Sequence, residues 1–150
     1  MRVALYQPEI AGNVGTILRT AACFAAGVDL IEPMGFPWGD RALARAGMDY
    51  VDTVSVRRHA DWDAFLETVD GRIVLFTTRG AVSLPKTRFE SDDILLFGSE
   101  SAGVPDSVQG CAALRVRIPM QAETRSLNLA VSAGIALAEA LRQTDGWPAG

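Results

Sequence analysis

The amino-acid sequence predicts an α/β protein in which a parallel β-sheet is flanked by helices on both faces. Short apolar runs recur along the chain, and stretches with apolar residues three or four positions apart separate them. The runs are rich in valine, leucine and isoleucine, which is typical of strands buried on both faces. Strands that alternate with helices in this way form parallel sheets. The chain has 150 residues without an evident linker or repeat, so we expect one domain over residues 1–150.

The expected strands are the short apolar runs. The N-terminal run is followed by Gln7-Pro8-Glu9 and is too short for the apolar region of a signal peptide, so we interpret it as a strand. The sequence VDTVSV alternates apolar and polar residues, which indicates a half-buried strand. In chain order, we expect strands over residues 3–6, 28–32, 51–56, 73–77, 94–97 and 114–118.

The expected helices lie between these strands. The first has Ile17, Leu18 and Ala21 on one face, and Asn13 is a candidate N-cap before it. The last is rich in small residues along one side. In chain order, we expect helices over residues 14–26, 41–46, 62–68 and 125–142.

Composition excludes several classes of protein. Hydrophobic residues make up 49% of the chain and the net charge is only −4, which excludes a disordered chain. No window approaches the ~18 consecutive apolar residues of a membrane span. Cys23 and Cys111 have no Cys or His neighbours, which argues against a metal site and favours the reducing cytoplasm. The single histidine, His59, follows two arginines and is interpreted as a surface residue.

Ligands of parallel sheets bind at the carboxyl ends of the strands, so the loops that follow strands form the expected site. The sequence Gly12-Asn13-Val14-Gly15 opens a helix after the first strand, but its spacing fails the dinucleotide-binding fingerprint. This disfavours a nucleotide-dependent oxidoreductase. The sequence also contains no Gly-Lys-Ser/Thr phosphate loop and no Gly-x-Ser-x-Gly nucleophile elbow. The loops of interest are residues 7–15, 33–40, 78–84, 98–105 and 119–128.

Three segments in or next to these loops form a more specific pattern. They are Asn13-x-Gly15-x-x-x-Arg19, Phe97-Gly98-Ser99-Glu100-x-x-Gly103-Val104-Pro105, and Ile118-Pro119-Met120 with Ser126-Leu127-Asn128-Leu129. With these motifs in this order, essentially the whole chain resembles the SpoU branch of the SPOUT superfamily, which comprises RNA 2'-O-methyltransferases. Two further segments resemble the branch that modifies the tRNA wobble nucleotide and has only the catalytic domain. They are Glu32-Pro33-Met34-Gly35-Phe36 and Arg45-Ala46-Gly47-Met48-Asp49-Tyr50.

The resemblance implies an enzyme that transfers a methyl group from S-adenosylmethionine to the ribose 2'-OH of nucleotide 34 of tRNA. That nucleotide would be cytidine or a modified uridine. The resemblance also implies a SPOUT fold with a C-terminal deep trefoil knot and a homodimer. The cofactor pocket would lie in the knot, near the subunit interface.

The family's functional residues carry over to matching positions. Arg19 matches the essential arginine, which would contact the phosphate of the target nucleotide or help to activate its hydroxyl. With a pKa above ~12, an arginine does not readily act as the base itself. The resemblance gives Arg19, Asn13, Ser126 and Asn128 as catalytic residues. It gives Phe76, Thr77, Gly98, Glu100, Ile118, Met120 and Ser126 as cofactor-binding residues.

Three of these residues have alternative structural roles. Asn13 and Asn128 are also suited to cap the N-termini of helices, and Glu100 is also suited to hold its own loop as an ion-pair partner. The residues alone leave both interpretations open.

Binding of RNA by this chain would depend on local clusters of charge. A sequence pI near 4.9 is atypical of a nucleic-acid-binding protein. Affinity nevertheless follows the number of phosphate contacts, and a homodimer would double each cluster. The candidate RNA-binding residues are Arg19, Arg41, Arg45, Arg57 and Arg58, with Arg79, Lys86, Arg88, Arg117 and Arg125 as further candidates.

One departure from the resemblance keeps alternatives open. Ala138 precedes Glu139 in the last helix, where close relatives have a tyrosine before the glutamate. A tyrosine-dependent contact with RNA or a second subunit is therefore in question. The alternatives are methylation of another tRNA or ribosomal RNA position, and a non-catalytic RNA-binding protein of the same fold.

Overall fold

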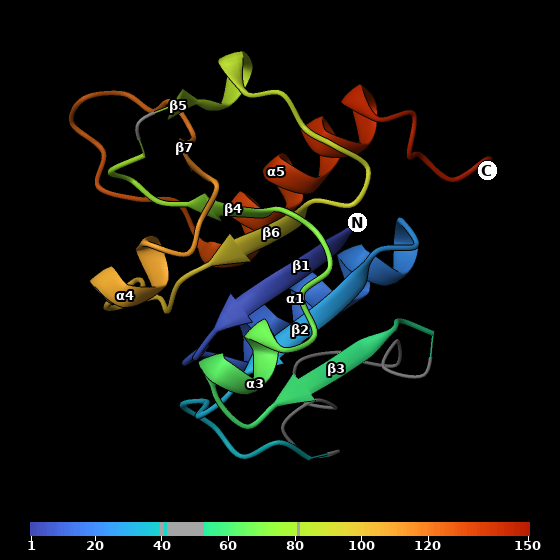
Figure 1. Ribbon diagram of the computed structural model, residues 1–150, viewed down its shortest axis with the longest axis vertical. Helices are drawn as coiled ribbons and strands as arrows, with labels where there is room; N and C mark the ends of the chain where they lie inside the picture. Colours follow the sequence, from blue (N-terminus) through green and yellow to red (C-terminus); the bar gives the residue numbers. More distant parts are fainter. Residues whose placement is uncertain (40, 42–52, 81) are drawn as a thin grey trace.

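A seven-stranded sheet forms the centre of the protein (Figure 1). The computed structural model describes residues 1–39, 41, 53–80 and 82–150. Neighbouring strands pair in parallel, in the order β3-β2-β1-β6-β4-β7-β5. The strands are β1 (Arg2–Tyr6), β2 (Gly27–Ile31), β3 (Val56–His59), β4 (Ile73–Phe76), β5 (Val82–Ser83), β6 (Ile94–Phe97) and β7 (Leu114–Arg117).

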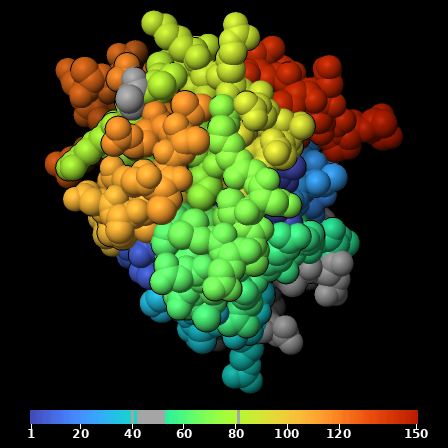
Figure 2. Space-filling model, viewed as in Figure 1, coloured from blue at the N-terminus to red at the C-terminus, as the bar shows by residue number. Residues whose placement is uncertain are grey.

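Helices cover both faces of this sheet, as the sequence predicts. On one face, α1 (Ala11–Cys23) and α5 (Leu129–Gln143) pack against each other and against the strands. On the other face, α3 (Trp62–Leu66) and α4 (Asp106–Gln109) pack through Phe65 and Val108. Figure 2 shows this second face, where α3 and α4 hide much of the sheet. A short 3-10 helix, η1 (Leu84–Lys86), follows β5.

The core consists of two apolar layers that the sheet separates. Successive strand residues face opposite sides, so Val3 and Leu5 join the layer under α1 and α5, while Ala4 joins the layer under α3. The central strands β2, β4 and β6 are buried along their full length. Full burial of each large aliphatic side chain contributes about 1.5–3 kcal/mol to stability. Strands buried on both faces therefore consist almost entirely of apolar residues, which is why unbroken apolar runs in the sequence predicted them.

The order of the strands creates a crevice between β1 and β6. These strands are neighbours, but β1 continues into α1 on one face and β6 continues towards α4 on the other face. In α/β sheets such a change of direction is the usual location of a ligand site.

The third expected strand was placed incorrectly. Residues 53–55 form a turn and a bend, and β3 begins at Val56. Arg57 and Arg58 of β3 are exposed, so this edge strand lacks the apolar alternation used for the prediction. The helix expected over residues 41–46 lies outside the described residues, apart from Arg41.

Two helix boundaries also differ from the prediction. Helix α1 begins at Ala11 with Ile10 as N-cap, so Asn13 lies inside its first turn and does not cap it. Helix α5 begins at Leu129, four residues later than expected, because Asn128 caps it. Its side-chain oxygen accepts hydrogen bonds from the N–H groups of Ala130 and Val131 at 2.8 and 3.2 Å. The elements β5, η1 and α4 were not predicted.

His59 is buried, so the prediction of a surface histidine was wrong. Its Nε2 atom lies 2.8 Å from Oδ1 of Asp29 on the neighbouring strand. The Nε of Arg2 donates a hydrogen bond to the other Asp29 oxygen at 2.6 Å. Asp29, inside an apolar strand, was the signal that could have revealed the burial of His59, because a buried carboxylate requires hydrogen-bonding partners. In the described part of the chain, no helix is long and apolar enough to cross a membrane.

Candidate active site

A cavity of about 710 Å³ lies at the carboxyl ends of β4, β6 and β7. Its walls are the loops that follow these strands, together with the starts of α1 and α5. The volume lies within the range of ordinary small-molecule sites. The cavity is lined by residues 75–79, 97–104 and 125–129, and by Ile10, Asn13, Asp106, Gln109, Ile118, Met120 and Ser132.

The structure brings together nine of the ten residues that the sequence assigned to catalysis or cofactor binding. Arg19 is the tenth and does not line the cavity. The nine residues come from four separate parts of the chain, and the parallel sheet places them together at one edge. They are Asn13, Phe76, Thr77, Gly98, Glu100, Ile118, Met120, Ser126 and Asn128.

One wall of the cavity is apolar. Phe76 ends β4 and stacks on Phe97 of β6, with ring centroids 5.0 Å apart and planes inclined by 12°. Ile118 and Met120 follow β7 and are half-buried. Thr77 donates its N–H to the carbonyl of Val116, which fixes the end of β4 against β7. This wall suits the flat apolar face of a purine.

A tight turn over residues 99–103 forms the opposite wall. Ser99 and Gly103 exchange backbone hydrogen bonds of 3.0 and 2.9 Å. Gly103 has a φ of 63°, a conformation that favours glycine. A Cβ atom on Gly98 would lie 2.4 Å from the carbonyl carbon of Gly103, so only glycine fits there. These two glycines let the turn close tightly beside the cavity.

Asn13, Glu100 and Asn128 form one hydrogen-bonded chain across the cavity wall. The Asn128 amide donates to Oδ1 of Asn13 at 3.0 Å, and the Asn13 amide donates to Glu100 at 3.2 Å. Asn128 also caps α5, so the same side chain holds the helix and lines the cavity. The chain joins the start of α1, the turn after β6 and the start of α5. The Glu100 carboxylate accepts only uncharged donors in these contacts, so the structure shows a loop-holding role without an ion pair.

Arg19 lies on the exposed face of α1, six positions after Asn13. Thr16 precedes it by one helical turn on that face and is also exposed. Arg19 is exposed on α1 and does not line the cavity, which suits a contact with a substrate that extends beyond the cavity.

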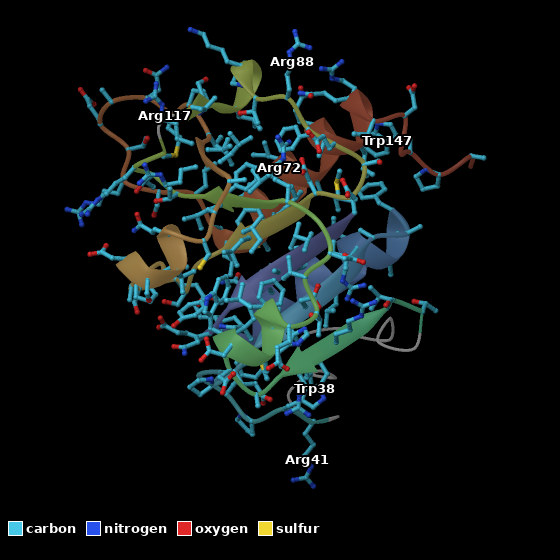
Figure 3. All side chains as sticks on the ribbon, in the orientation of Figure 1. Trp38, Arg41, Arg72, Arg88, Arg117 and Trp147 are labelled. Atoms are coloured by element: carbon cyan, nitrogen blue, oxygen red, sulfur yellow. The ribbon has the colours of Figure 1, made fainter. Side chains whose placement is uncertain are left out.

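The candidate RNA-binding arginines occupy separate regions. Arg57 and Arg58 lie on the edge strand β3, and Arg58 pairs with Glu32 at 2.7 Å while its guanidinium carbon sits 5.2 Å from the centre of the Trp38 ring. Arg41 is exposed near Trp38 (Figure 3). Arg117 and Arg88 lie at the opposite end of the view. Arg45 lies outside the described residues.

Several lining residues lie in the expected loops but were not assigned to catalysis or cofactor binding. Arg79 and Arg125 supply positive charge at the cavity, and both were named only as further RNA-binding candidates. Ile10, Ser99 and Ser101 were not assigned a role. Their position directly after a strand, which the sequence does predict, was the available signal.

The comparisons with known proteins agree with this geometry. Residues 1–138 match the SpoU rRNA Methylase family. A relative from Ancylobacter novellus named tRNA (cytidine(34)-2'-O)-methyltransferase is 47% identical over 150 residues, covering 98% of this chain and 95% of the relative. A relative of the same name from Escherichia coli K12 is 39% identical, covering 99% of this chain and 96% of its own length.

Solved structures are similar to the whole fold. A structure described as giving insights into the 2-OH methylation of C/U34 on tRNA has a TM-score of 0.89 at 44% identity, covering 95% of this chain and 94% of that one. An AdoMet-bound rRNA methyltransferase from Sinorhizobium meliloti has a TM-score of 0.84 at 33% identity. That match covers 94% of this chain and 55% of the other protein, which is therefore much longer.

Proposed function

The chain belongs to the SpoU rRNA methylase family, and we propose that it transfers a methyl group from S-adenosylmethionine to the ribose 2'-OH of nucleotide 34 of tRNA. The nucleotide is cytidine or a modified uridine. One observation carries the proposal, namely the gathering of nine predicted site residues around one cavity at the carboxyl edge of the sheet. The relatives that act on position 34 share nearly the full length of the chain.

The cavity fits S-adenosylmethionine by its shape and chemistry. Phe76, Ile118 and Met120 provide apolar surface for the adenine ring. Gly98 lets the turn over residues 99–103 close beside the cavity, because any side chain there would collide with Gly103. Thr77, Ser126 and the backbone groups of the two loops provide hydrogen-bonding groups for the polar parts. When bound, the cofactor supplies an electrophilic methyl group on a sulfonium centre.

The protein contributes mainly by positioning the reacting groups. Methyl transfer requires the attacking oxygen, the methyl carbon and the sulfur to lie in line, and such alignment lowers the barrier by several kcal/mol. Asn13, Ser126 and Asn128 orient polar groups at the cavity. Arg19 holds the phosphate of the target nucleotide or assists the hydroxyl. A ribose hydroxyl also needs a base to accept its proton.

The RNA contacts arginines both at the cavity and on outer parts of the surface. Arg57, Arg58 and Arg41 are exposed, and Arg79 and Arg125 line the cavity itself. Counterion release from the bound phosphates favours binding in proportion to the contacts made, so an acidic chain is able to bind tRNA. The outer arginines belong to the RNA-binding surface and not to the reacting centre.

We also propose that two copies form a homodimer through the exposed face of α5. Leu127, Val131 and Ile135 are four positions apart and are 38–50% exposed, and Ile10 beside them is 51% exposed. Exposed apolar residues that cluster in this way mark association surfaces. The surface adjoins the cavity, which Ile10 and Leu127 also line.

The remaining parts of the proposal follow from family membership. Residues 1–150 form one methyltransferase domain, and the segment from β7 to α5 passes through the chain as a deep trefoil knot. We place the enzyme in the cytoplasm, together with its tRNA substrate.

The test is methyl transfer from labelled S-adenosylmethionine to unmodified total tRNA, followed by nuclease digestion and mass mapping of the label. We expect label on a 2'-O-methylated ribose at position 34. Label at another position, or on ribosomal RNA only, would overturn the substrate. Binding of S-adenosylmethionine without any labelled RNA would overturn the enzymatic function in favour of a non-catalytic RNA-binding protein.

A further inference from the structure

The carboxylates of Glu9 and Glu100 each bind the opposite loop across the crevice between β1 and β6. The Glu100 carboxylate accepts hydrogen bonds from the N–H groups of Glu9 and Ile10 at 2.7 and 3.3 Å. In return, the Glu9 carboxylate accepts the N–H of Ser101 at 3.2 Å and the hydroxyl of the same serine. We call this exchange between residues 9–10 and 100–101 the reciprocal clamp. Hydrogen bonds to a carboxylate are stronger than those between neutral groups.

The clamp joins two loops that would otherwise separate. The loop after β1 leads into α1 on one face of the sheet, and the loop after β6 leads towards α4 on the other face. Neighbouring strands whose connections diverge in this way leave a crevice at their carboxyl ends. The reciprocal clamp crosses this crevice with four hydrogen bonds.

The side of the clamp formed by Glu9 reaches the tip of the turn that lines the cavity. Ser101 lies at this tip, opposite the backbone pairing of Ser99 with Gly103. Every residue from Gly98 to Val104 lines the cavity, so movement of the tip would displace the cavity wall. Glu9 itself does not line the cavity.

The backbone of Glu9 is held from the other side as well. Gly35 donates its N–H to the carbonyl of Pro8 at 2.9 Å. A Cβ atom on Gly35 would lie 2.8 Å from Cα of Glu9, so the loop after β2 packs directly on this residue. These contacts hold the backbone of Glu9 independently of the contact between its side chain and Ser101. A side chain anchored in this way can hold the turn still.

The charge of Glu9 fits this role. Its hydrogen bonds from the hydroxyl and the N–H of Ser101 lower its pKa, so the carboxylate remains ionised at neutral pH and keeps both acceptor oxygens available. Neither the hydroxyl nor the amide of Ser101 carries a charge of its own. The contact therefore orients the turn and does not form a salt bridge.

We propose that Glu9 is a positioning residue for S-adenosylmethionine, acting through Ser101 to hold the turn over residues 99–103 in the conformation that binds the cofactor. This inference rests on the proposed function. It assigns a task to a residue outside the cavity and outside the motifs that predicted the site. Glu100 belongs to the same turn, and its carboxylate binds the N–H groups of Glu9 and Ile10 in the facing loop.

The test is calorimetric binding of S-adenosylmethionine to the full-length protein without RNA. We expect Glu9→Ala to raise the dissociation constant about tenfold, the effect of losing hydrogen bonds to a charged acceptor. Glu9→Gln keeps one acceptor oxygen and should give a smaller increase, about threefold. Glu67→Ala removes an exposed glutamate from the end of α3 and serves as the matched control, with binding unchanged.

Two further measurements separate positioning from general destabilisation. In steady-state methyl transfer, Glu9→Ala should raise the KM for S-adenosylmethionine while kcat at saturating cofactor stays within about threefold. In a double-mutant cycle, Ser101→Ala should weaken binding less in the Glu9→Ala protein than in the unmodified protein. Should Glu9→Ala fail to fold, Ser101→Ala removes the hydroxyl that donates to Glu9 and tests the same contact. We expect it to raise the dissociation constant about threefold.

The outcomes distinguish this inference from the function on which it rests. If the unmodified protein does not bind S-adenosylmethionine, the proposed function fails and the inference fails with it. If the unmodified protein binds it and folded Glu9→Ala binds equally well, only the inference is overturned. Additive effects in the double-mutant cycle would likewise overturn it.

Discussion

Two of the polar groups centred on carboxylates in the described residues differ in location and in partners. Within the sheet, Asp29 is only 2% exposed and lies between Arg2 and His59 at 2.6 and 2.8 Å. At the carboxyl edge, Glu100 is half-buried and accepts hydrogen bonds from two backbone amides and from Asn13. The first group is enclosed, and the second borders a cavity.

The difference follows from the cost of leaving a charge without partners. A buried carboxylate such as Asp29 is almost inaccessible to water, so loss of its partners would leave an uncompensated charge in the core. Glu100 and Glu9 remain close to solvent, so the loss of one contact there costs little folding free energy. Among the described residues, no buried side-chain polar atom lacks a hydrogen-bond partner. We therefore expect the group within the sheet to determine stability and the group at the edge to determine activity.

The largest expected effect tests the activity side of this comparison. Arg19→Ala should reduce methyl transfer about a thousandfold or more, because it removes the cation that holds the target nucleotide. Binding of S-adenosylmethionine and the melting temperature should stay close to those of the unmodified protein, since Arg19 is exposed and does not line the cavity. Methyl transfer into tRNA, calorimetry and thermal unfolding measure the three quantities.

Arg115→Ala is the matched control for this experiment. Arg115 is an exposed arginine on β7 and belongs to neither set of candidate residues, so its loss should leave methyl transfer unchanged. Weakened cofactor binding in Arg19→Ala would contradict a role restricted to the nucleotide.

The second prediction concerns the enclosed carboxylate. Asp29→Ala leaves Arg2 and His59 without their shared partner and should lower the free energy of unfolding by about 3–5 kcal/mol. Urea unfolding measures this change, and Asp70→Ala, at an exposed aspartate, is the control. Methyl transfer per folded molecule should remain near normal. A loss below about 1 kcal/mol would show that the group within the sheet does not determine stability.

The third prediction separates two tasks of a single residue at the edge. In Asn128→Asp, the carboxylate oxygen still caps α5, but it no longer donates a hydrogen bond to Asn13. We expect stability within about 0.5 kcal/mol of the unmodified protein and methyl transfer reduced about tenfold to a hundredfold. Asn128→Ala loses both interactions and should also lose about 1 kcal/mol of stability. Equal stability losses in the two variants would contradict this separation.

The same contrast explains how much of the fold could be predicted from sequence. The runs that became β4 and β6 are fully buried, so hydrophobicity alone identified them. The edge strand β3 has exposed arginines and is held by backbone pairing to β2, which the side-chain pattern does not reveal. His59 appeared to be a surface residue because its partner Asp29 lies 30 positions earlier in the chain.

The candidate site could be predicted only in part for a related reason. Motif residues such as Gly98 and Asn128 follow strands or precede helices, and these positions are visible in the sequence. The reciprocal clamp joins Glu9 to Ser101 across 92 positions, and no local pattern connects them. Asn13 was a reasonable candidate cap by residue type, but its amide instead meets Glu100, 87 positions later. Long-range polar contacts depend on the packed sheet and therefore become visible only in the structure.

The smallest expected effect concerns another carboxylate, Glu139, which is half-buried on α5 and belongs to neither group. Hydrogen bonds from Arg142 and then Gln143 lower its pKa to about 2 from an ordinary value of 4.5. A carboxylate whose pKa is lowered by folding stabilises the protein above its unfolded pKa, and this contribution is lost as the pH falls from about 4.5 towards 2. Solvent screens the pair, since Arg142 is 66% exposed.

Glu139→Gln should therefore lower the free energy of unfolding by about 0.5 kcal/mol or less at pH 7. The difference from the unmodified protein should shrink as the pH falls through that window, and about 1 M salt should largely remove it. Urea unfolding at several pH values measures the difference, with Glu67→Gln as the control at an exposed glutamate. A loss of unfolding free energy above about 1 kcal/mol that persists in salt would show that a carboxylate near solvent also stabilises the fold. The contrast between Asp29 and Glu100 would then need a cause other than burial.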